Sequence, residues 1–240
     1  MVIHISNKKL TVLIFSVLAV CFLCAGGSKL MKREVLARFP VCDKTIIIDA
    51  GHGGLDGGAV SEDGVSEKEI NLSIAKYLES YLNQSGARVI MTRSTDKSLH
   101  KDENATVNEK KKSDLLVRKS KVNESGADLF ISIHQNYFTQ SQYKGAQVFY
   151  DSKSPLSQKC ALIIQNSIKD NADSDNLRVP MQIDKSKMLF SDLKLPAVLV
   201  ECGFLSNPEE AAKLKNKEYQ QKIAFSIYLG IIQYFDKEAR

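Results

Sequence analysis

Short, mostly apolar runs rich in β-branched residues constrain the fold of this 240-residue chain more than any other feature. The clearest runs are residues 45–48, 128–133 and 197–200. Apolar runs of this length are typical of strands that are covered on both faces, as they are in parallel sheets. Weaker strand patterns occupy residues 88–92 and 147–150. We therefore predict a largely buried sheet.

Helical periodicity follows the first strand, after a glycine-rich loop. Ser66 and Glu69 have the spacing of a capping box, and Gly86 is typical of a helix C-terminus. The apolar residues between these signals recur at helical spacing. They are Ile70, Ile74, Tyr77, Leu78, Tyr81 and Leu82. We predict a helix that starts at Ser66 and ends before Gly86.

The rest of the chain continues the alternation of strands and helices. Residues 94–113 are polar, lysine-rich and aperiodic, which indicates a surface loop or lid, and a helix ending near Asn123 follows. Further helices are predicted over residues 157–168 and 219–235, and another begins at its N-cap Asn207. The alternation predicts a single α/β domain: a twisted, mostly parallel sheet flanked by helices on both faces.

The composition agrees with one globular domain and disfavours nucleic acid as a partner. Hydrophobic residues make up 43% of the chain and charged residues 25%, which is ordinary for a globular protein. The formal net charge of +5 is mild and would favour an anionic surface such as a bacterial wall. Basic residues are not interleaved with aromatic ones as in a base-stacking surface, so we expect no nucleic-acid partner.

The N-terminus has the pattern of an export signal. Lys8 and Lys9 precede an apolar run over residues 10–25, which small residues follow. The cleavage site is not a clean one, so residues 1–27 are predicted to be either a signal peptide or an N-terminal membrane anchor. We expect export across the cytoplasmic membrane, with membrane contact only through this segment.

Beyond this segment we predict a linker over residues 28–44 and the globular domain over residues 45–240. This part of the chain contains three cysteines, Cys42, Cys160 and Cys202. An odd number cannot be paired completely within one molecule. We expect Cys160 and Cys202 to be small buried residues.

Three polar residues stand at the predicted carboxyl ends of buried strands. His52 lies just beyond the first strand, and His134 and Glu201 end two later ones. Ligands bind at this edge of open α/β sheets. A hydrogen-bonded structural role would explain any one of these residues, but it explains all three together less well.

Glu67, in the first turn of the first helix, is a fourth candidate. It either complements the helix dipole or faces the strand ends. Two imidazoles and one carboxylate form a known catalytic zinc set, which leaves a fourth position for water. A second carboxylate is then needed to accept a proton from that water, and Glu201 has the residue type and position for this role.

Four sequence blocks, in order, carry a resemblance to a known family. They are Asp49-Ala50-Gly51-His52-Gly53-Gly54-x-Asp56-x-Gly58-Ala59, Glu67-Lys68-x-Ile70-Asn71-Leu72, Ser132-Ile133-His134-x-Asn136 and Val200-Glu201-x-Gly203-Phe204-x-Ser206-Asn207. The chain resembles the zinc-dependent N-acetylmuramoyl-L-alanine amidases of the amidase-3 family over about residues 45–235. The resemblance covers almost the whole of the predicted domain.

The resemblance implies one zinc ion per chain, held by His52, Glu67 and His134, with Glu201 as the catalytic glutamate. It makes residues 45–240 a zinc amidase catalytic domain. The expected substrate is peptidoglycan, a glycan strand with its stem peptides. The expected reaction is hydrolysis of the amide between the lactyl group of N-acetylmuramic acid and L-alanine.

The compact domain, the export signal and the polar insert before Leu115 look most like the germination-specific subgroup of this family. That likeness implies a role in spore cortex maturation, where muramic-δ-lactam is made, and in germination. It places the protein on the cell-wall or spore-cortex side of the membrane, either secreted or membrane-anchored. Family members are often held in check by a helix or a partner, so a regulatory protein partner is also expected.

Other interpretations remain open at this level. The chain could be a non-catalytic peptidoglycan-binding module, or a zinc peptidase that acts on stem peptides. A phosphate-binding loop over residues 51–58 is disfavoured because the G-K-[ST] ending is missing. Asn136 either orients a ligand or makes a strand-end hydrogen bond. Arg93 and Arg118 either meet a substrate carboxylate or form surface ion pairs.

Overall fold

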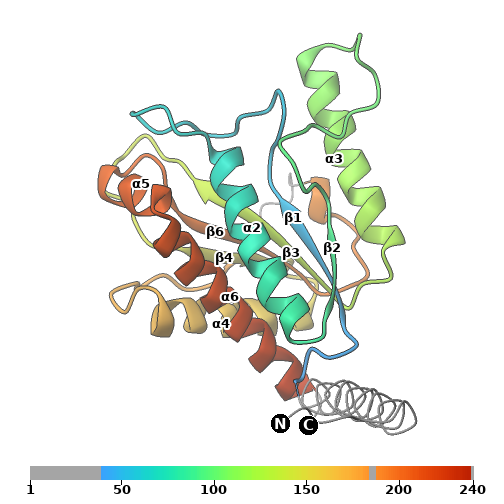
Figure 1. The fold of residues 1–240 in the computed structure, drawn as a ribbon, viewed down its shortest axis with the longest axis vertical. Helices are drawn as coiled ribbons and strands as arrows, with labels where there is room; N and C mark the ends of the chain where they lie inside the picture. Colours follow the sequence, from blue (N-terminus) through green and yellow to red (C-terminus); the bar gives the residue numbers. More distant parts are fainter. Residues whose placement is uncertain (1–38, 184–187, 239–240) are drawn as a thin grey trace, which may run out of the picture. The chain divides into compact units, whose positions relative to one another are not determined.

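A six-stranded sheet lies at the centre of the computed structural model, which describes residues 39–183 and 188–238 (Figure 1). Its strand order is β2-β1-β3-β6-β4-β5. The strands are β1 (Thr45–Ala50), β2 (Arg88–Met91), β3 (Leu129–Asn136), β4 (Gln147–Tyr150), β5 (Met181–Gln182) and β6 (Ala197–Phe204). All neighbouring strands are parallel except β4 and β6, which run antiparallel. The prediction of a mostly parallel sheet is confirmed.

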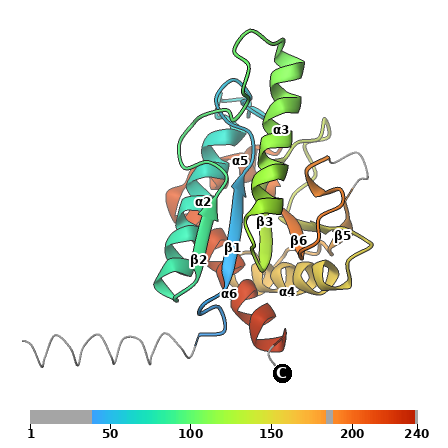
Figure 2. The ribbon, with the colours of Figure 1, turned by 90° about the vertical axis from the view of Figure 1, so that its right-hand side faces the viewer.

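Helices cover both faces of this sheet, as predicted. The helices are α2 (Glu67–Gln84), α3 (Val107–Glu124), α4 (Pro155–Asn171), α5 (Pro208–Lys215), α6 (Lys217–Glu238) and the short 3-10 helix η1 (Met188–Phe190). Helices α2, α4 and α6 pack on one face, while α3 and η1 pack on the other (Figures 1 and 2). The fold is a single α/β domain.

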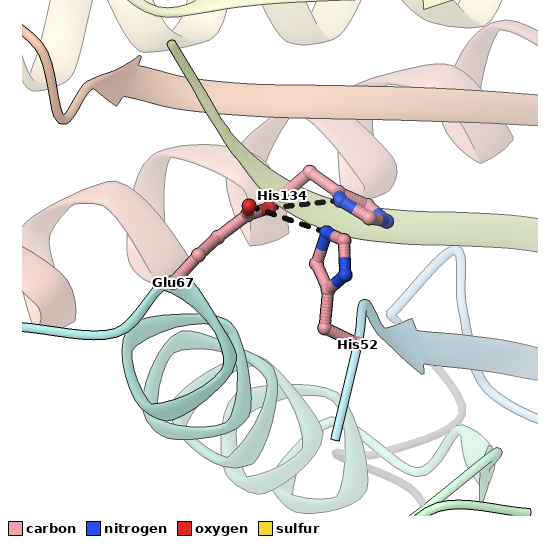
Figure 3. Close-up of side chains that lie close together, drawn as sticks. All are labelled: His52, Glu67 and His134. Atoms are coloured by element: carbon pink, nitrogen blue, oxygen red, sulfur yellow. Dashed lines mark hydrogen bonds and ion pairs between the residues drawn. The ribbon is translucent and has the colours of Figure 1, made fainter. Parts of the chain in front are cut away.

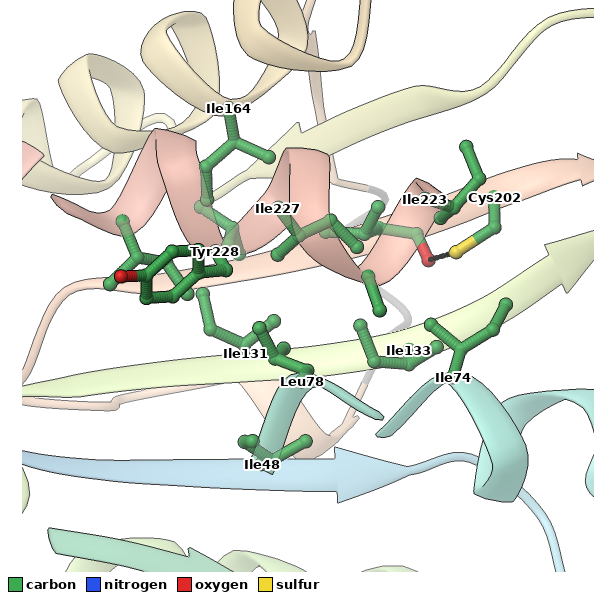
Figure 4. Close-up of a cluster of buried hydrophobic side chains, with 14 of the residues drawn as sticks. Ile48, Ile74, Leu78, Ile131, Ile133, Ile164, Cys202, Ile223, Ile227 and Tyr228 are labelled. Atoms are coloured by element: carbon green, nitrogen blue, oxygen red, sulfur yellow. Dashed lines mark hydrogen bonds between the residues drawn. The ribbon is translucent and has the colours of Figure 1, made fainter. Parts of the chain in front are cut away.

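The alternation of side chains along the strands divides the core in two. Ile48 and Ile131 face α2 and α6 in the larger cluster, which Figure 4 shows. Ile47 and Phe130, one position earlier on the same strands, face α3 and η1. Because the strands are buried on both faces, they read as continuous apolar runs in the sequence.

The same alternation places four polar strand residues on the face covered by α3 and η1. Asp49 is the register partner of Ser132, and His134 is the register partner of Glu201. Residues two apart on a strand share a face, so Ser132 and His134 lie on the side of Phe130. These polar side chains therefore lie together on one face of the sheet, towards the carboxyl ends of β1 and β3.

The cysteine prediction is confirmed for two residues. Cys160 and Cys202 are fully buried, and Cys202 lies beside Ile223 in the larger core (Figure 4). Burial raises the pKa of both thiols well above its usual range, so they stay protonated. Both cysteines therefore act as small apolar residues.

Helix α2 begins and ends where predicted, but the predicted capping box is wrong. The Ser66 hydroxyl donates to the carbonyl of Gly57 at 2.7 Å and caps no helical amide. It thus ties the helix start to the preceding glycine-rich loop. At the other end, Gly86 has a φ of 87°, which suits glycine at a helix C-terminus. The Asn207 cap of α5 is confirmed, since its side chain accepts from Glu210 N.

Helix α3 begins at Val107, so the prediction of loop structure up to residue 113 is wrong. Its start carries a capping box that sequence analysis overlooked, in which Thr106 and Glu109 bond each other's backbone amides. The helix buries few residues, and two of them, Asp114 and Arg118, are charged. Such a helix lacks the apolar stripe by which helices are recognised in sequence.

Strands β3 and β6 extend further than predicted, so the candidate site residues lie inside them. His134 and Glu201 lie within their strands, not at the ends. Pairing continues past them to Asn136 and Phe204, after an irregularity in register. The predicted arrangement at strand ends is therefore corrected to positions in the carboxyl halves of the strands.

The predicted signal or anchor over residues 1–27, and most of the linker over 28–44, lie outside the described residues. Within the described parts of the chain, no helix combines the length and apolar character needed to span a membrane.

Candidate metal centre

His52 is presented by a sharp turn that directly follows β1. Its φ of 60° lies in the left-handed region, which is uncommon for residues other than glycine. The carbonyl of His52 accepts a hydrogen bond from Arg118 Nη2 at 2.6 Å, which holds this backbone in place. Gly53 and Gly54 continue the turn, also with positive φ.

Glu67, the first residue of α2, is buried beneath this turn with an exposed fraction of 3%. Its Oε2 accepts from the Ala59 amide at 2.9 Å, and its Oε1 accepts from the Gln135 amide at 3.0 Å. Asn71, one turn along α2, donates to both Glu67 Oε1 and the Gly51 carbonyl. The carboxylate is thus fixed in direction by backbone and side-chain donors.

The structure brings His52, Glu67 and His134 together, as Figure 3 shows. Glu67 Oε1 lies 2.9 Å from His134 Nδ1, and Glu67 Oε2 lies 3.2 Å from His52 Nε2. One ligand atom from each residue lies within 4.8 Å of the others. Tetrahedral zinc with bonds of about 2.0–2.2 Å needs ligand atoms about 3.3–3.6 Å apart. Small movements of the side chains would meet this requirement.

The electrostatics of the cluster favour a cation. Burial alone would lower the pKa of His52, but hydrogen bonds to Asp56 and Glu67 outweigh it and raise this pKa to about 9. Burial would likewise raise the pKa of Glu67, but His134 and His52 hold it well below its usual range. A carboxylate that stays ionised while almost completely buried needs a positive neighbour, and a metal ion would supply one.

Two glycines leave the space in which these side chains sit. A Cβ atom on Gly51 would lie 2.2 Å from His134 Nε2, and one on Gly58 would lie 2.5 Å from Glu67 Oε2. Contacts this short are not found in real structures, so a side chain at either position would have to displace the His134 ring or the Glu67 carboxylate. The donor set and its surroundings therefore fit a metal ion.

Asp56 orients His52, a role that sequence analysis did not assign. Its Oδ2 lies 2.8 Å from His52 Nδ1, and its Oδ1 pairs with Lys111 Nζ at 2.9 Å. A carboxylate on the second ring nitrogen of a ligand histidine fixes the tautomer and the ring plane. The spacing of Asp56 four residues after His52, in a glycine-rich loop, is the available sequence signal.

A cleft of about 480 Å³ opens beside the cluster. His52, Glu67, His134 and Glu201 line it. Further lining residues come from α3, η1 and β6, and several of them are apolar. The apolar ones are Leu115, Met188, Leu189, Phe190 and Leu199. The arrangement combines a cation site, a nearby carboxylate and room for a substrate, as in metal-assisted hydrolysis.

The model of the family "Amidase_3: N-acetylmuramoyl-L-alanine amidase" matches residues 46–233. The chain belongs to this amidase family. The predictions of family and of enzyme class are confirmed, and peptidoglycan is the substrate that the family implies.

Individual relatives support the same family assignment. The amidase is 39% identical to the germination-specific N-acetylmuramoyl-L-alanine amidase of Bacillus subtilis (strain 168) over 83% of each chain. Its structure matches that of the CwlD amidase from Clostridioides difficile, solved in complex with the GerS lipoprotein. That match has a TM-score of 0.79 and 44% identity, covering 81% of this chain and all of the other. An N-acetylmuramoyl-L-alanine amidase from Clostridium difficile 630 matches with a TM-score of 0.70 and 29% identity, over 82% and 98% of the two chains.

Sequence analysis gave Arg93 and Arg118 two alternative roles, contact with a substrate carboxylate or surface ion pairs. Both alternatives are wrong, because the two side chains are buried. Their exposed fractions are only 1% and 2%. Arg93 donates to the carbonyls of Ala50 and Gly51. Arg118 donates to the carbonyls of Ala50 and His52. Both guanidinium groups therefore hold the backbone of the His52 turn from inside.

Asn136 makes a local hydrogen bond, one of the two roles considered for it. Its Oδ1 accepts from the Tyr137 amide at 2.9 Å, although the residue also lines the cleft. Glu201 lines the same cleft, beside His134 on the neighbouring strand. Glu201 is not one of the three clustered residues, which separates it from the candidate ligands.

A Gly51→Ala variant is expected to disrupt the metal centre while the fold survives. The new methyl group would displace the His134 ring, and a misplacement of about 1 Å can cost roughly 100-fold in activity. We expect a lower content of bound metal by elemental analysis and a corresponding fall in kcat/KM.

Gly57→Ala is the matched control, since its Cβ would meet only the Ser66 Oγ at 3.3 Å. Normal metal content and activity in Gly51→Ala would show that the His134 ring is not held where the structure has it.

Proposed function

We propose that this amidase is zinc-dependent and that His52, Glu67 and His134 hold the zinc ion. The observation that carries the proposal is the convergence of these three side chains on one point, with glycines at the positions that a Cβ would block. His52 would use Nε2, since its Nδ1 faces Asp56, and His134 would use Nδ1. When bound, zinc supplies a Lewis acid that makes water acidic and polarises a carbonyl oxygen.

Glu201 is the general base in this proposal. It lies in the cleft, on the same face of the sheet as its register partner His134. Its carboxylate accepts a proton as water attacks the lactyl carbonyl, and returns it to the amide nitrogen of L-alanine as the bond breaks. Asp56 keeps His52 oriented during these steps, and Gln135 N and Ala59 N hold Glu67 in place.

The proposed setting is the spore cortex, on the outer side of the cytoplasmic membrane. Support comes from the relative named germination-specific in Bacillus subtilis. Export would use the segment over residues 1–27, either cleaved or retained as an anchor. Deletion of the gene should yield spores whose cortex lacks muramic-δ-lactam. An unchanged cortex would contradict this role without affecting the amidase assignment.

A regulatory protein partner is part of the proposal. The CwlD amidase of Clostridioides difficile was solved in complex with the GerS lipoprotein, and it shares 44% identity with this chain. If a partner is needed, the purified chain should bind zinc weakly or cleave slowly when alone. Full zinc loading and full activity in isolation would argue against this requirement.

The test of the proposed reaction is digestion of purified peptidoglycan with and without added zinc. We expect free amino termini on L-alanine, with activity lost in chelator and restored by zinc. New amino termini inside the stem peptide would indicate a zinc peptidase instead. Binding of peptidoglycan without any cleavage, with zinc present, would indicate a binding module.

A further inference from the structure

Among the acidic side chains that line the cleft lies one basic side chain that is half exposed. Within the described residues, the lysine and arginine side chains that line the cleft are Lys111 and Arg118. All five N–H donors of Arg118 are directed at protein acceptors, and the side chain is 2% exposed. Arg118 therefore has nothing left to offer a substrate.

Lys111 differs from Arg118 in both respects. Its side chain is 50% exposed, and its ammonium contacts Asp56 Oδ1 at 2.9 Å. An ammonium group has three N–H donors, so this contact leaves capacity for another acceptor. Asp114 and Arg118 follow on the same face of α3, three and seven residues later, and anchor the helix that carries Lys111.

The ion pair with Asp56 places the ammonium next to the metal centre. Asp56 bridges Lys111 and His52, so only one carboxylate and one imidazole ring separate the ammonium from the metal-facing nitrogen of His52. An extended peptide advances about 3.3–3.6 Å per residue. A substrate group one or two residues from the scissile amide would therefore come within reach of Lys111.

Peptidoglycan carries an anion at that place. The residue after L-alanine in the stem peptide is a D-glutamate linked through its side-chain carboxyl, so its α-carboxyl group can remain free. The apolar side chains that line the cleft, among them Leu115, Met188 and Phe190, offer this carboxylate no hydrogen-bond donor. The acidic side chains of the cleft, among them Asp56 and Glu201, would repel it.

We infer that Lys111 is a specificity residue that binds the free α-carboxylate of the second stem-peptide residue. The inference rests on the proposed function and adds a preference to it. A free carboxylate at this position is favoured over a carboxamide, which carries no charge.

The test measures kcat and KM for two soluble muropeptides that differ only at this group, one a carboxylate and the other a carboxamide. The full chain is used, loaded with zinc and supplied with any partner that it needs. We expect the wild type to prefer the carboxylate by about tenfold, mainly through KM, as suits a charge-assisted hydrogen bond. Lys111→Met should abolish the preference, and Lys111→Arg should keep most of it.

Lys112→Met is the matched control, because Lys112 is the next residue on the same helix, exposed and absent from the cleft lining. It should keep the preference. If Lys111→Met slows both substrates equally, or lowers zinc content, Lys111 only supports Asp56 and the inference fails. It also fails if the wild type treats the two substrates alike.

A failure of the proposed function can be distinguished from a failure of this inference. If the wild type cleaves neither muropeptide, calorimetric titration of the two uncleaved compounds still measures the preference. Tighter binding of the carboxylate by wild type but not by Lys111→Met would uphold the role of Lys111 without catalysis. Equal binding by both proteins would refute it.

Discussion

Glu201→Gln is expected to lower the amidase kcat by about 10²–10⁴-fold while zinc binding and stability stay unchanged. Glutamine keeps the shape of the side chain but cannot accept a proton. Glu201 lies in the cleft beside His134 and outside the cluster of candidate ligands, so its loss should leave the metal in place. The measurement is steady-state kinetics on peptidoglycan together with zinc content.

Glu69→Gln serves as the control for this variant, because Glu69 is an exposed residue of α2 that does not line the cleft. It should retain wild-type kinetics. A Glu201→Gln protein that binds zinc and still cleaves at the wild-type rate would exclude Glu201 as the base. Loss of zinc from that variant would instead make Glu201 part of the metal centre.

Arg118→Met is expected to lower the free energy of unfolding by about 3–5 kcal/mol. Arg118 is buried between Asp49 and Asp114, which are themselves 1% and 6% exposed. Removing it would leave two carboxylates buried without this partner, and would free the carbonyls of Ala50 and His52. Urea denaturation measures the change in stability, and zinc content reports the loosened His52 turn.

The effect of Arg118→Met should depend on pH through Asp49. Burial alone would raise the pKa of Asp49, but the charge of Arg118 and further contacts lower it to about 2, against an ordinary value of 3.8. Its contribution to stability is therefore present above about pH 4 and lost as the pH falls towards 2. The difference in free energy of unfolding between wild type and Arg118→Met should therefore become smaller as the pH falls from about 4 to about 2.

Lys112→Met, on the exposed side of α3, should keep the wild-type free energy of unfolding at all these pH values. Arg118→Lys should recover only part of the lost stability, since lysine cannot reach the several acceptors that a guanidinium spans. An Arg118→Met protein as stable as wild type would mean that Asp49 and Asp114 are not held as charged groups.

The fold was predicted well for elements whose buried residues form a recognisable apolar pattern in the sequence. Strand β1 has five fully or nearly fully buried residues, and its apolar run predicted it almost to the residue. Helix α3 was predicted too short because it buries two charged residues, Asp114 and Arg118, which sequence patterns treat as solvent-exposed. Strand β5 is only two residues long and exposed, so it left no pattern to recognise.

The sequence by itself determined the apolar strands, most of the helices, and the four residues His52, Glu67, His134 and Glu201 as candidates. Residue type and position within short blocks are local properties, so they can be read along a chain. The tertiary structure alone decided that Arg93 and Arg118 face inwards, that Asp56 orients His52, and that Lys111 reaches the cleft. The roles of the two arginines and of Lys111 depend on contacts between residues far apart in the chain, such as the 42 positions from Gly51 to Arg93 and the 69 from Asp49 to Arg118. Only the packing of α3 and β2 against the loop after β1 brings such residues together, and a local sequence pattern does not record that packing.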